Sequence, residues 1–159
     1  MTYPTADLWD EFEDELTVLN VTMNAYGKLD LFHGRCVTLK VYEDNTLVKK
    51  ELQQNGKGKV LVVDGGSSRR CALMGDNLAQ IAIDNEWSGV IIYGCIRDSS
   101  QINEMPIAVK ALGTCPAKSR KRNEGIQYQE LIIEGTRINN GAYIYADSDG
   151  ILIADTKLR

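Results

Sequence analysis

The sequence predicts a single compact α/β domain spanning residues 1–159, on three observations. In the first two thirds, apolar runs typical of buried strands alternate with segments of helical periodicity. In the last third, short strand-like runs are separated by Asn-Gly and Asp-Gly turn signals. The length, with 43% hydrophobic and 25% charged residues, suits one domain with a real core.

The N-terminal third predicts a helix, a loop and a strand. Thr5 is a candidate helix cap, and apolar residues then recur at near-helical spacing as far as Leu16. Glycines bound a loop at residues 27–34. Residues 36–42 alternate apolar and polar side chains, which is typical of a strand with one buried face.

The middle third predicts further alternation of helices and strands. Asp44 or Asn45 caps a short helix that ends near Gly56. The apolar run at residues 59–64 indicates a strand buried on both faces, and a turn-rich Gly-Gly-Ser-Ser loop follows it. The next predicted elements are a short apolar segment at 71–74, a helix from Gly75, a strand at 90–93, a helical turn at 99–104 and a strand at 107–115.

The C-terminal third predicts β hairpins. Strand-like runs occupy residues 127–134, 142–146 and 151–154. Turn signals at residues 139–141 and 147–150 separate them. Early β-α alternation therefore gives way to antiparallel strands.

Charge and hydropathy exclude several classes of function. The net charge of −4 argues against direct nucleic-acid binding, because phosphate contacts need a basic face. The N-terminus lacks the pattern of a signal peptide, and no apolar run is long enough to span a bilayer. We expect a cytoplasmic protein. The basic run at residues 118–122 is either a solvated loop or a binding patch for RNA or an acidic partner.

The cysteines predict no metal site. Cys36, Cys71, Cys95 and Cys115 are far apart, and no two of them form a Cys-x-x-Cys pair. In a cytosolic protein they are most simply small buried hydrophobic residues. His33 is the single histidine and has no zinc-ligand spacing around it.

The stretch at residues 75–98 is the candidate site. It opens with a helix-start signal at Gly75 to Asn77, and its strand ends on the charged pair Arg97 and Asp98. The first N–H groups of a helix can bind an anion, and a strand's carboxyl end lies on the same sheet edge as the neighbouring helix start. Two alternatives remain open at this point: Asp76 and Asn77 could only cap the helix, and Arg97 and Asp98 could be an exposed ion pair.

Several motifs resemble the RraA-like family, which contains the regulator of RNase E activity A and the class II 4-hydroxy-4-methyl-2-oxoglutarate aldolases. The resemblance covers nearly the whole chain. The motifs are Tyr-Glu-Asp-Asn at 42–45, Gly-Lys-Gly-Lys-Val at 56–60, Val-Val-Asp-Gly-Gly at 62–66, Gly-Asp-Asn-Leu-Ala at 75–79, Val-Ile-Ile-Tyr-Gly-Cys-Ile-Arg-Asp at 90–98 and Tyr-Ala-Asp-Ser-Asp-Gly-Ile at 145–151.

The resemblance implies a fold like the swivelling phosphohistidine domain, a β/β/α sandwich or barrel. It also implies a ring-shaped homotrimer with sites at or near subunit boundaries. Some relatives have been called menaquinone methyltransferases, but this sequence has no glycine-rich cofactor motif to support that activity.

The sequence also resembles the pattern of the aldolase branch. That pattern is an Asp, twenty residues, Arg-Asp, two residues and then an acidic residue. Asp76, Arg97 and Asp98 match it, whereas Gln101 stands at the last position, with Glu104 nearby. By resemblance Asp98 binds a divalent metal cation, Mg²⁺ or Mn²⁺, and Arg97 binds the substrate and stabilises its enolate. Asp76 holds or activates a water that acts as general base. The backbone N–H groups of Gly75, Asp76, Asn77 and Leu78 bind a substrate oxygen.

Two functions follow from the resemblance. The first is a metal-dependent lyase acting on an α-keto acid: it cleaves 4-hydroxy-4-methyl-2-oxoglutarate to pyruvate and decarboxylates oxaloacetate through a pyruvate enolate. The alternative is a non-catalytic regulator that binds and inhibits RNase E or binds its associated helicases. Asp98 favours the enzyme, and Gln101 favours the regulator.

Overall fold

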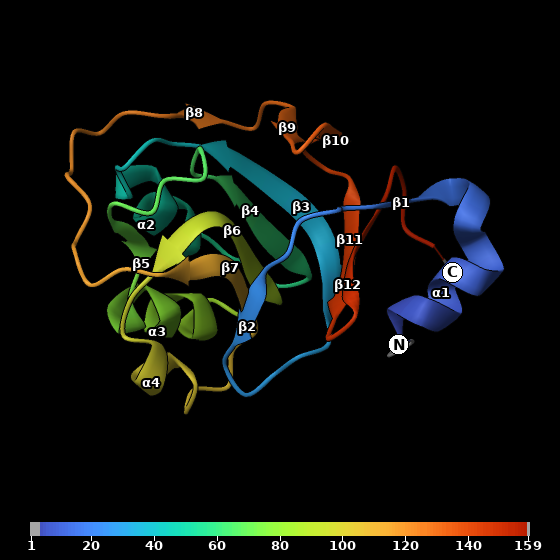
Figure 1. The fold of residues 1–159 in the computed structure, drawn as a ribbon, viewed down its shortest axis with the longest axis horizontal. Coiled ribbons are helices and arrows are strands. Elements are labelled where there is room, and N and C mark those ends of the chain that lie inside the picture. Colours follow the sequence, from blue (N-terminus) through green and yellow to red (C-terminus); the bar gives the residue numbers. More distant parts are fainter. Residues whose placement is uncertain (1–3, 159) are drawn as a thin grey trace.

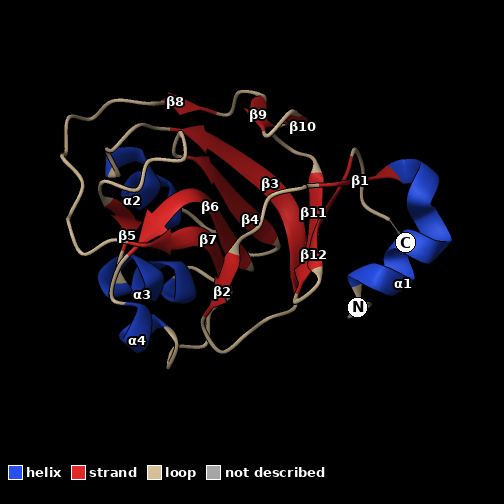
Figure 2. Cartoon of the chain, viewed as in Figure 1, coloured by secondary structure: helices blue, strands red, loops and turns tan. Residues whose placement is uncertain are grey.

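A ten-stranded mixed sheet organises the computed structural model, which describes residues 4–158 (Figures 1 and 2). Its strand order is β1-β12-β11-β3-β4-β6-β7-β2, with β5 paired to β6 and β8 paired to β3. A separate hairpin joins β9 and β10. The strands are β1 (Leu16–Val18), β2 (Asn24–Tyr26), β3 (Phe32–Lys40), β4 (Lys59–Asp64), β5 (Ala72–Met74), β6 (Gly89–Ile96), β7 (Val109–Thr114), β8 (Ile126–Gln127), β9 (Leu131–Ile133), β10 (Thr136–Ile138), β11 (Tyr143–Asp147) and β12 (Gly150–Ala154).

The centre of the sheet is parallel, as the predicted β-α alternation requires. Strands β3, β4, β6 and β7 are joined in parallel, and short helices connect them. The helices α2, α3 and α4 pack on one face of these strands, where Leu52, Ala79 and Ile102 are fully buried. The helices are α1 (Thr5–Phe12), α2 (Thr46–Leu52), α3 (Asp76–Asp84), α4 (Ser99–Ile102) and a 3₁₀ turn at Glu13–Glu15.

Other elements pack on the opposite face and on the antiparallel end of the sheet. The β9–β10 hairpin buries Leu131, Ile133 and Ile138 against the face that α2 and α3 leave open. Helix α1 packs on β11 and β12 through Leu8, and both ends of the chain lie beside it (Figure 1). The prediction of an α/β domain with a parallel core and antiparallel C-terminal strands is therefore confirmed.

The prediction that Thr5 caps the first helix is wrong. Pro4 is the N-cap, and Thr5 is the first helical residue. Its backbone N–H and its hydroxyl both donate to the Asp147 carboxylate at 2.7 Å. The helix ends at Phe12, and Leu16 belongs to β1, because a 3₁₀ turn separates the two elements.

Other boundaries also differ from the predictions. Strand β3 begins at Phe32, inside the predicted loop, because β11 pairs with its first half. The Asn-Gly turn at 139–141 does not close a hairpin: β10 pairs with β9, whereas β11 pairs with β12 and β3. The predicted strand at 127–134 is split between β8 and β9. The turn at 147–150 does close a hairpin, with Asp147 opposite Gly150.

The cysteines behave as small core residues in the structure. Cys36, Cys71 and Cys95 are buried, Cys115 is partly buried, and all four are reduced. Burial raises the pKa of the Cys36 thiol to about 12. Across residues 4–158, none of the helices has the length and apolar character needed to cross a membrane.

Candidate functional site

The pairing of β5 with β6 builds the site. Met74 and Ile96 are partners in the two parallel strands, and the Arg97 N–H donates to the Met74 carbonyl oxygen at 2.9 Å. The chain then turns into α3 immediately after Met74 and into α4 soon after Ile96. The start of α3 and the end of β6 therefore lie together at one edge of the sheet, as the β-α-β pattern predicts.

Asp98 joins the start of α3 to the end of β6. Its Oδ2 accepts the backbone N–H of Asp76, the first residue of α3, at 3.0 Å. Gly75 is the N-cap of this helix and has no side chain to cap it. Asp76 and Asn77 are therefore not the residues that cap α3. Asp98, 22 residues away from Asp76, supplies the capping oxygen.

The Asp98 contact changes which helical N–H groups remain for a ligand. The Asp76 N–H is already bonded, and the Ala79 N–H donates to the Gly75 carbonyl oxygen at 3.0 Å. The N–H groups of Asn77 and Leu78 are the ones that the helix start leaves available. Of the four residues predicted to bind substrate through the backbone, Asp76 therefore does not offer its N–H.

The absence of a side chain at Gly75 leaves space for the Asp98 carboxylate. A Cβ atom at this position would lie 2.5 Å from Asp98 Oδ2, closer than such atoms approach, and 3.4 Å from Arg97 Cγ. The backbone angles of Gly75 are φ −126° and ψ −164°, which any residue can adopt. The glycine is therefore required by the packing of Asp98 and not by its own conformation.

Asp98 has an unusual backbone. Its φ of 59° and ψ of 37° lie in the left-handed region, where Asp and Asn are tolerated better than most residues. From this position it starts α4, and its carbonyl oxygen accepts the Ile102 N–H at 2.9 Å. The left-handed turn redirects the chain and aims the carboxylate back at α3.

Arg97 lies half-buried beside this carboxylate without forming an ion pair. Within residues 4–158, no carboxylate oxygen lies within 4.0 Å of its guanidinium nitrogens. Its Nη1 is 3.5 Å from the carbonyl oxygen of Pro116, an acceptor that no local sequence pattern could have located. The alternative of a simple Arg97–Asp98 ion pair is therefore not what the structure contains, and the guanidinium charge stays available for an anion.

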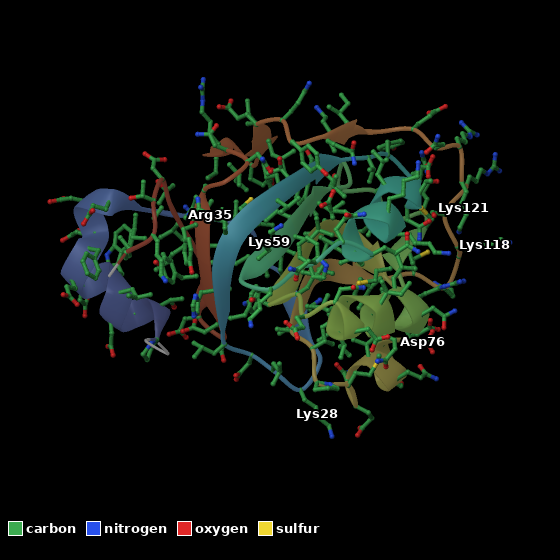
Figure 3. The ribbon with its side chains drawn as sticks, turned by 180° about the vertical axis from the view of Figure 1, so that it is seen from behind. Lys28, Arg35, Lys59, Asp76, Lys118 and Lys121 are labelled. Carbon is green, nitrogen blue, oxygen red and sulfur yellow. The ribbon has the colours of Figure 1, made fainter. Side chains whose placement is uncertain are left out.

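Asp76 and the residues after Asp98 surround this centre. Asp76 begins α3 and is partly exposed; Figure 3 labels it at the end of that helix. Gln101 and Glu104 are both exposed, on α4 and just after it. The structure thus brings Gly75, Asp76, Arg97 and Asp98 together, while their functional roles stay predictions.

The donor set suits a hard cation that keeps most of its water. Within residues 4–158, no three His, Cys, Asp or Glu side chains converge to hold a metal ion. The single hydrogen bond that described residues donate to the Asp98 carboxylate is the one at Oδ2. Mg²⁺ commonly binds through one or two carboxylates, with waters and substrate oxygens as its other ligands, so Asp98 and a nearby Asp76 fit it.

Comparisons with known proteins agree over almost the whole chain. The RraA-like family model, described as Aldolase/RraA, matches residues 5–153. A protein from Dechloromonas aromatica named "Putative 4-hydroxy-4-methyl-2-oxoglutarate aldolase" is 50% identical over 162 residues, covering 99% of each chain.

Two solved structures have the same fold. One is described as an S-adenosylmethionine: 2-dimethylmenaquinone methyltransferase from Geobacillus kaustophilus; it is 50% identical, with a TM-score of 0.96, and the match covers 98% of this chain and 97% of that one. The other is the RNA-processing inhibitor RraA from Thermus thermophilis. It is 39% identical with a TM-score of 0.96, and the match covers 100% of this chain and 96% of that one.

Proposed function

The chain belongs to the RraA-like family, and from that premise we propose that it is a metal-dependent lyase that releases pyruvate from 4-hydroxy-4-methyl-2-oxoglutarate and from oxaloacetate. The observation that carries the proposal is the convergence at one sheet edge of the Asp98 carboxylate, the α3 N-terminus and the Arg97 guanidinium, which forms no ion pair with a described residue. These groups are metal-binding, anion-binding and cationic respectively, which is what an α-keto acid requires.

The residues have distinct tasks in this proposal. Asp98 would hold the divalent cation, with Asp76 near enough to bind one of its waters; the bound cation would supply positive charge beside the keto oxygen. Arg97 would donate to the same oxygen and stabilise the negative charge that develops there. The N–H groups of Asn77 and Leu78 would bind a carboxylate oxygen at the start of α3.

Retro-aldol cleavage breaks the bond between C3 and C4 of the substrate. A water held by Asp76 would take the proton of the C4 hydroxyl, C4 would become a carbonyl, and the bonding electron pair would pass to the pyruvate enolate. Arg97 would stabilise the enolate oxygen until C3 is protonated. Oxaloacetate decarboxylation reaches the same enolate, so one site would serve both reactions.

The test is pyruvate release from both substrates with Mg²⁺, with Mn²⁺ and with a chelator. The informative variant is Asp98→Asn, because Asn tolerates the left-handed backbone and can still accept the Asp76 N–H while it removes the charge. Turnover should fall by about 100-fold or more with an unchanged melting temperature. Asp98→Ala should lose turnover as well, but it adds backbone strain at φ 59°.

The second candidate is a non-catalytic regulator of RNA processing. Two observations favour it: the 39% identity to the RNA-processing inhibitor from Thermus thermophilis, and the presence of Gln101 where the aldolase pattern has an acidic residue. If wild-type protein releases no pyruvate above the metal-only background, the lyase proposal fails. Inhibition of purified RNase E by the wild-type protein would then assign the regulator.

A further inference from the structure

The basic run at residues 118–122 has no part in the proposed reaction, and the structure places it beside a hollow. The hollow has a volume of about 510 Å³, and charged side chains dominate its lining. We call it the basic hollow; its charged residues are Glu43, Asp44, Arg70, Lys118, Arg120 and Arg122. The sequence alone allowed either a solvated loop or a binding patch here, and the structure places three of its basic residues at a hollow.

The two carboxylates of the basic hollow are committed to internal contacts. Glu43 Oε2 accepts hydrogen bonds from the Arg70 Nε–H at 2.7 Å and the Ser68 hydroxyl at 2.6 Å. These two bonds, together with the charges of Arg70 and Arg120, lower the pKa of Glu43. Arg70 is thereby neutralised by Glu43.

Asp44 is committed in the same way. It is almost fully buried, with 2% of its surface exposed. Its Oδ1 accepts the N–H and hydroxyl of Thr46, and its Oδ2 accepts the backbone N–H groups of Arg122 and Glu124 at 2.7 and 3.1 Å. Its charge is therefore used by backbone and hydroxyl donors and not by the cationic side chains.

Three cations of the basic hollow form no ion pair with a described residue. Across residues 4–158, no carboxylate lies within 4.0 Å of the charged groups of Lys118, Arg120 or Arg122. Their backbone is not loose: besides the Arg122 N–H bond to Asp44, the Arg120 N–H donates to the Glu43 carbonyl oxygen at 3.0 Å. A fixed backbone that presents three cations without an ion-pair partner among the described residues to a hollow, in a chain of net charge −4, has the features of an anion site.

The basic hollow adjoins the Arg97 site through one short segment. The Pro116 carbonyl oxygen faces Arg97 Nη1, and the next carbonyl oxygen, that of Ala117, accepts the N–H of Ala72 in β5 at 2.8 Å. Lys118 follows directly. Its Cα is at most about 8 Å from that of Pro116, since consecutive Cα atoms are 3.8 Å apart. Lys118, whose side chain lines the basic hollow, therefore follows within two residues the segment that Arg97 contacts.

We propose that the basic hollow binds the second carboxylate of the substrate, the one at the end opposite the keto acid, and that Lys118 is its principal contact. This inference rests on the proposed function, in which the keto-acid end occupies Arg97 and Asp98. The substrate 4-hydroxy-4-methyl-2-oxoglutarate and oxaloacetate both carry a second carboxylate. Lys118 and its neighbours are therefore specificity-determining residues that select dicarboxylic over monocarboxylic keto acids.

The test uses two non-cleavable ligands of equal length. 2-Oxoglutarate carries a carboxylate at C5, whereas 2-oxopentanoate carries a methyl group there. Titration calorimetry with Mg²⁺ should show that the wild-type protein binds 2-oxoglutarate about tenfold more tightly. Lys118→Ala should remove most of that preference and leave 2-oxopentanoate affinity unchanged, and Lys118→Arg should restore it.

Lys121→Ala is the matched control. Lys121 belongs to the same basic run and is exposed, but it does not line the basic hollow, and Figure 3 shows both lysines on the loop on the same side of the view as Asp76. This variant should keep the full preference for the dicarboxylate. Both substitutions lie at exposed side chains, so neither should change the melting temperature.

The outcomes separate this inference from the proposed function. If Lys118→Ala leaves the preference intact, or weakens both ligands equally, the second-carboxylate site is overturned even if pyruvate is released. Binding of RNA or an acidic peptide that Lys118→Ala abolishes, with the ligand preference intact, would also overturn it and would assign the hollow to a macromolecule. If wild-type protein discriminates but releases no pyruvate, the lyase fails while the site stands.

Discussion

Gly75 shows how a single residue can be required by a neighbour's side chain. Its extended backbone would accept any amino acid, yet the space that a Cβ would occupy holds Asp98 Oδ2. The same oxygen caps α3 and leaves the carboxylate beside Arg97. The position of the proposed metal ligand therefore depends on the absence of a side chain 23 residues earlier.

Gly75→Ala should therefore impair the site without unfolding the protein. The added methyl group must displace the Asp98 carboxylate, so the half-saturating Mg²⁺ concentration for pyruvate release should rise by about tenfold or more. The measurement is a Mg²⁺ titration of turnover beside a thermal unfolding scan. Gln80→Ala, an exposed change on α3 with its side chain bonded to Asp84, is the control; equal behaviour of the two variants would contradict the interpretation.

At the scale of elements, one buried carboxylate fastens the basic loop to the start of α2. Burial by itself raises the pKa of Asp44, but hydrogen bonds from the Thr46 hydroxyl and from the N–H groups of Thr46, Glu124 and Arg122 outweigh it and lower the pKa to about 2. Because the folded pKa lies below its ordinary value of 3.8, the ionised form stabilises the fold. That contribution is complete above about pH 4 and is lost as the pH falls towards 2.

Asp44→Asn should consequently destabilise the protein in a pH-dependent way. At pH 7 the free energy of unfolding should fall by about 2 kcal/mol, since one pKa unit corresponds to about 1.4 kcal/mol. At pH 3 the difference between variant and wild type should be smaller, because wild-type Asp44 is partly protonated in the unfolded chain there. Urea unfolding at both pH values measures it, and a difference that does not change with pH would refute the explanation.

At the scale of the whole molecule, Asp147 ties the N-terminal helix to the β11–β12 turn and to β7, the strand next to the edge strand β2. Its carboxylate accepts the N–H and hydroxyl of Thr5, 142 residues away, and the N–H of Asp149. Its carbonyl oxygen accepts a hydrogen bond from the buried Lys110 ammonium on β7 at 2.5 Å. Helix α1, the β11–β12 turn and β7 therefore meet at this residue.

Asp147→Asn should loosen α1 before it affects the parallel core. An amide oxygen can replace only part of the carboxylate's acceptor capacity, so we expect a loss of about 1–3 kcal/mol and faster proteolytic cleavage between α1 and β1. Limited proteolysis followed by mass spectrometry locates the cut. Asp10→Asn, on the exposed side of α1, is the control. Cleavage that is unchanged in Asp147→Asn would show that α1 is held mainly by its apolar contacts.

Much of this architecture could be predicted because it depends on local pattern. The run at residues 59–64 became β4 with the predicted bounds, and the helix starting after Gly75 became α3. Periodicity reports which face of an element is buried, and turn residues report where an element stops. The predictions were wrong where an element's partner is distant in the sequence. Strand β3 begins at Phe32 because β11 pairs there, and Thr5 donates to Asp147 and does not cap the helix.

By itself, the sequence determined the α/β class, the order of the central elements, the family resemblance and the six residues of the candidate site. These follow from side-chain periodicity and from motifs that are contiguous or regularly spaced along the chain. Only the tertiary structure decided that Asp98 caps α3, that Arg97 has no carboxylate partner within the described chain, and that the basic run borders a hollow. The reason is physical: hydrogen bonds and charge compensation depend on distances between atoms, and for residues 22 or more positions apart those distances are set by how the sheet brings the strands together.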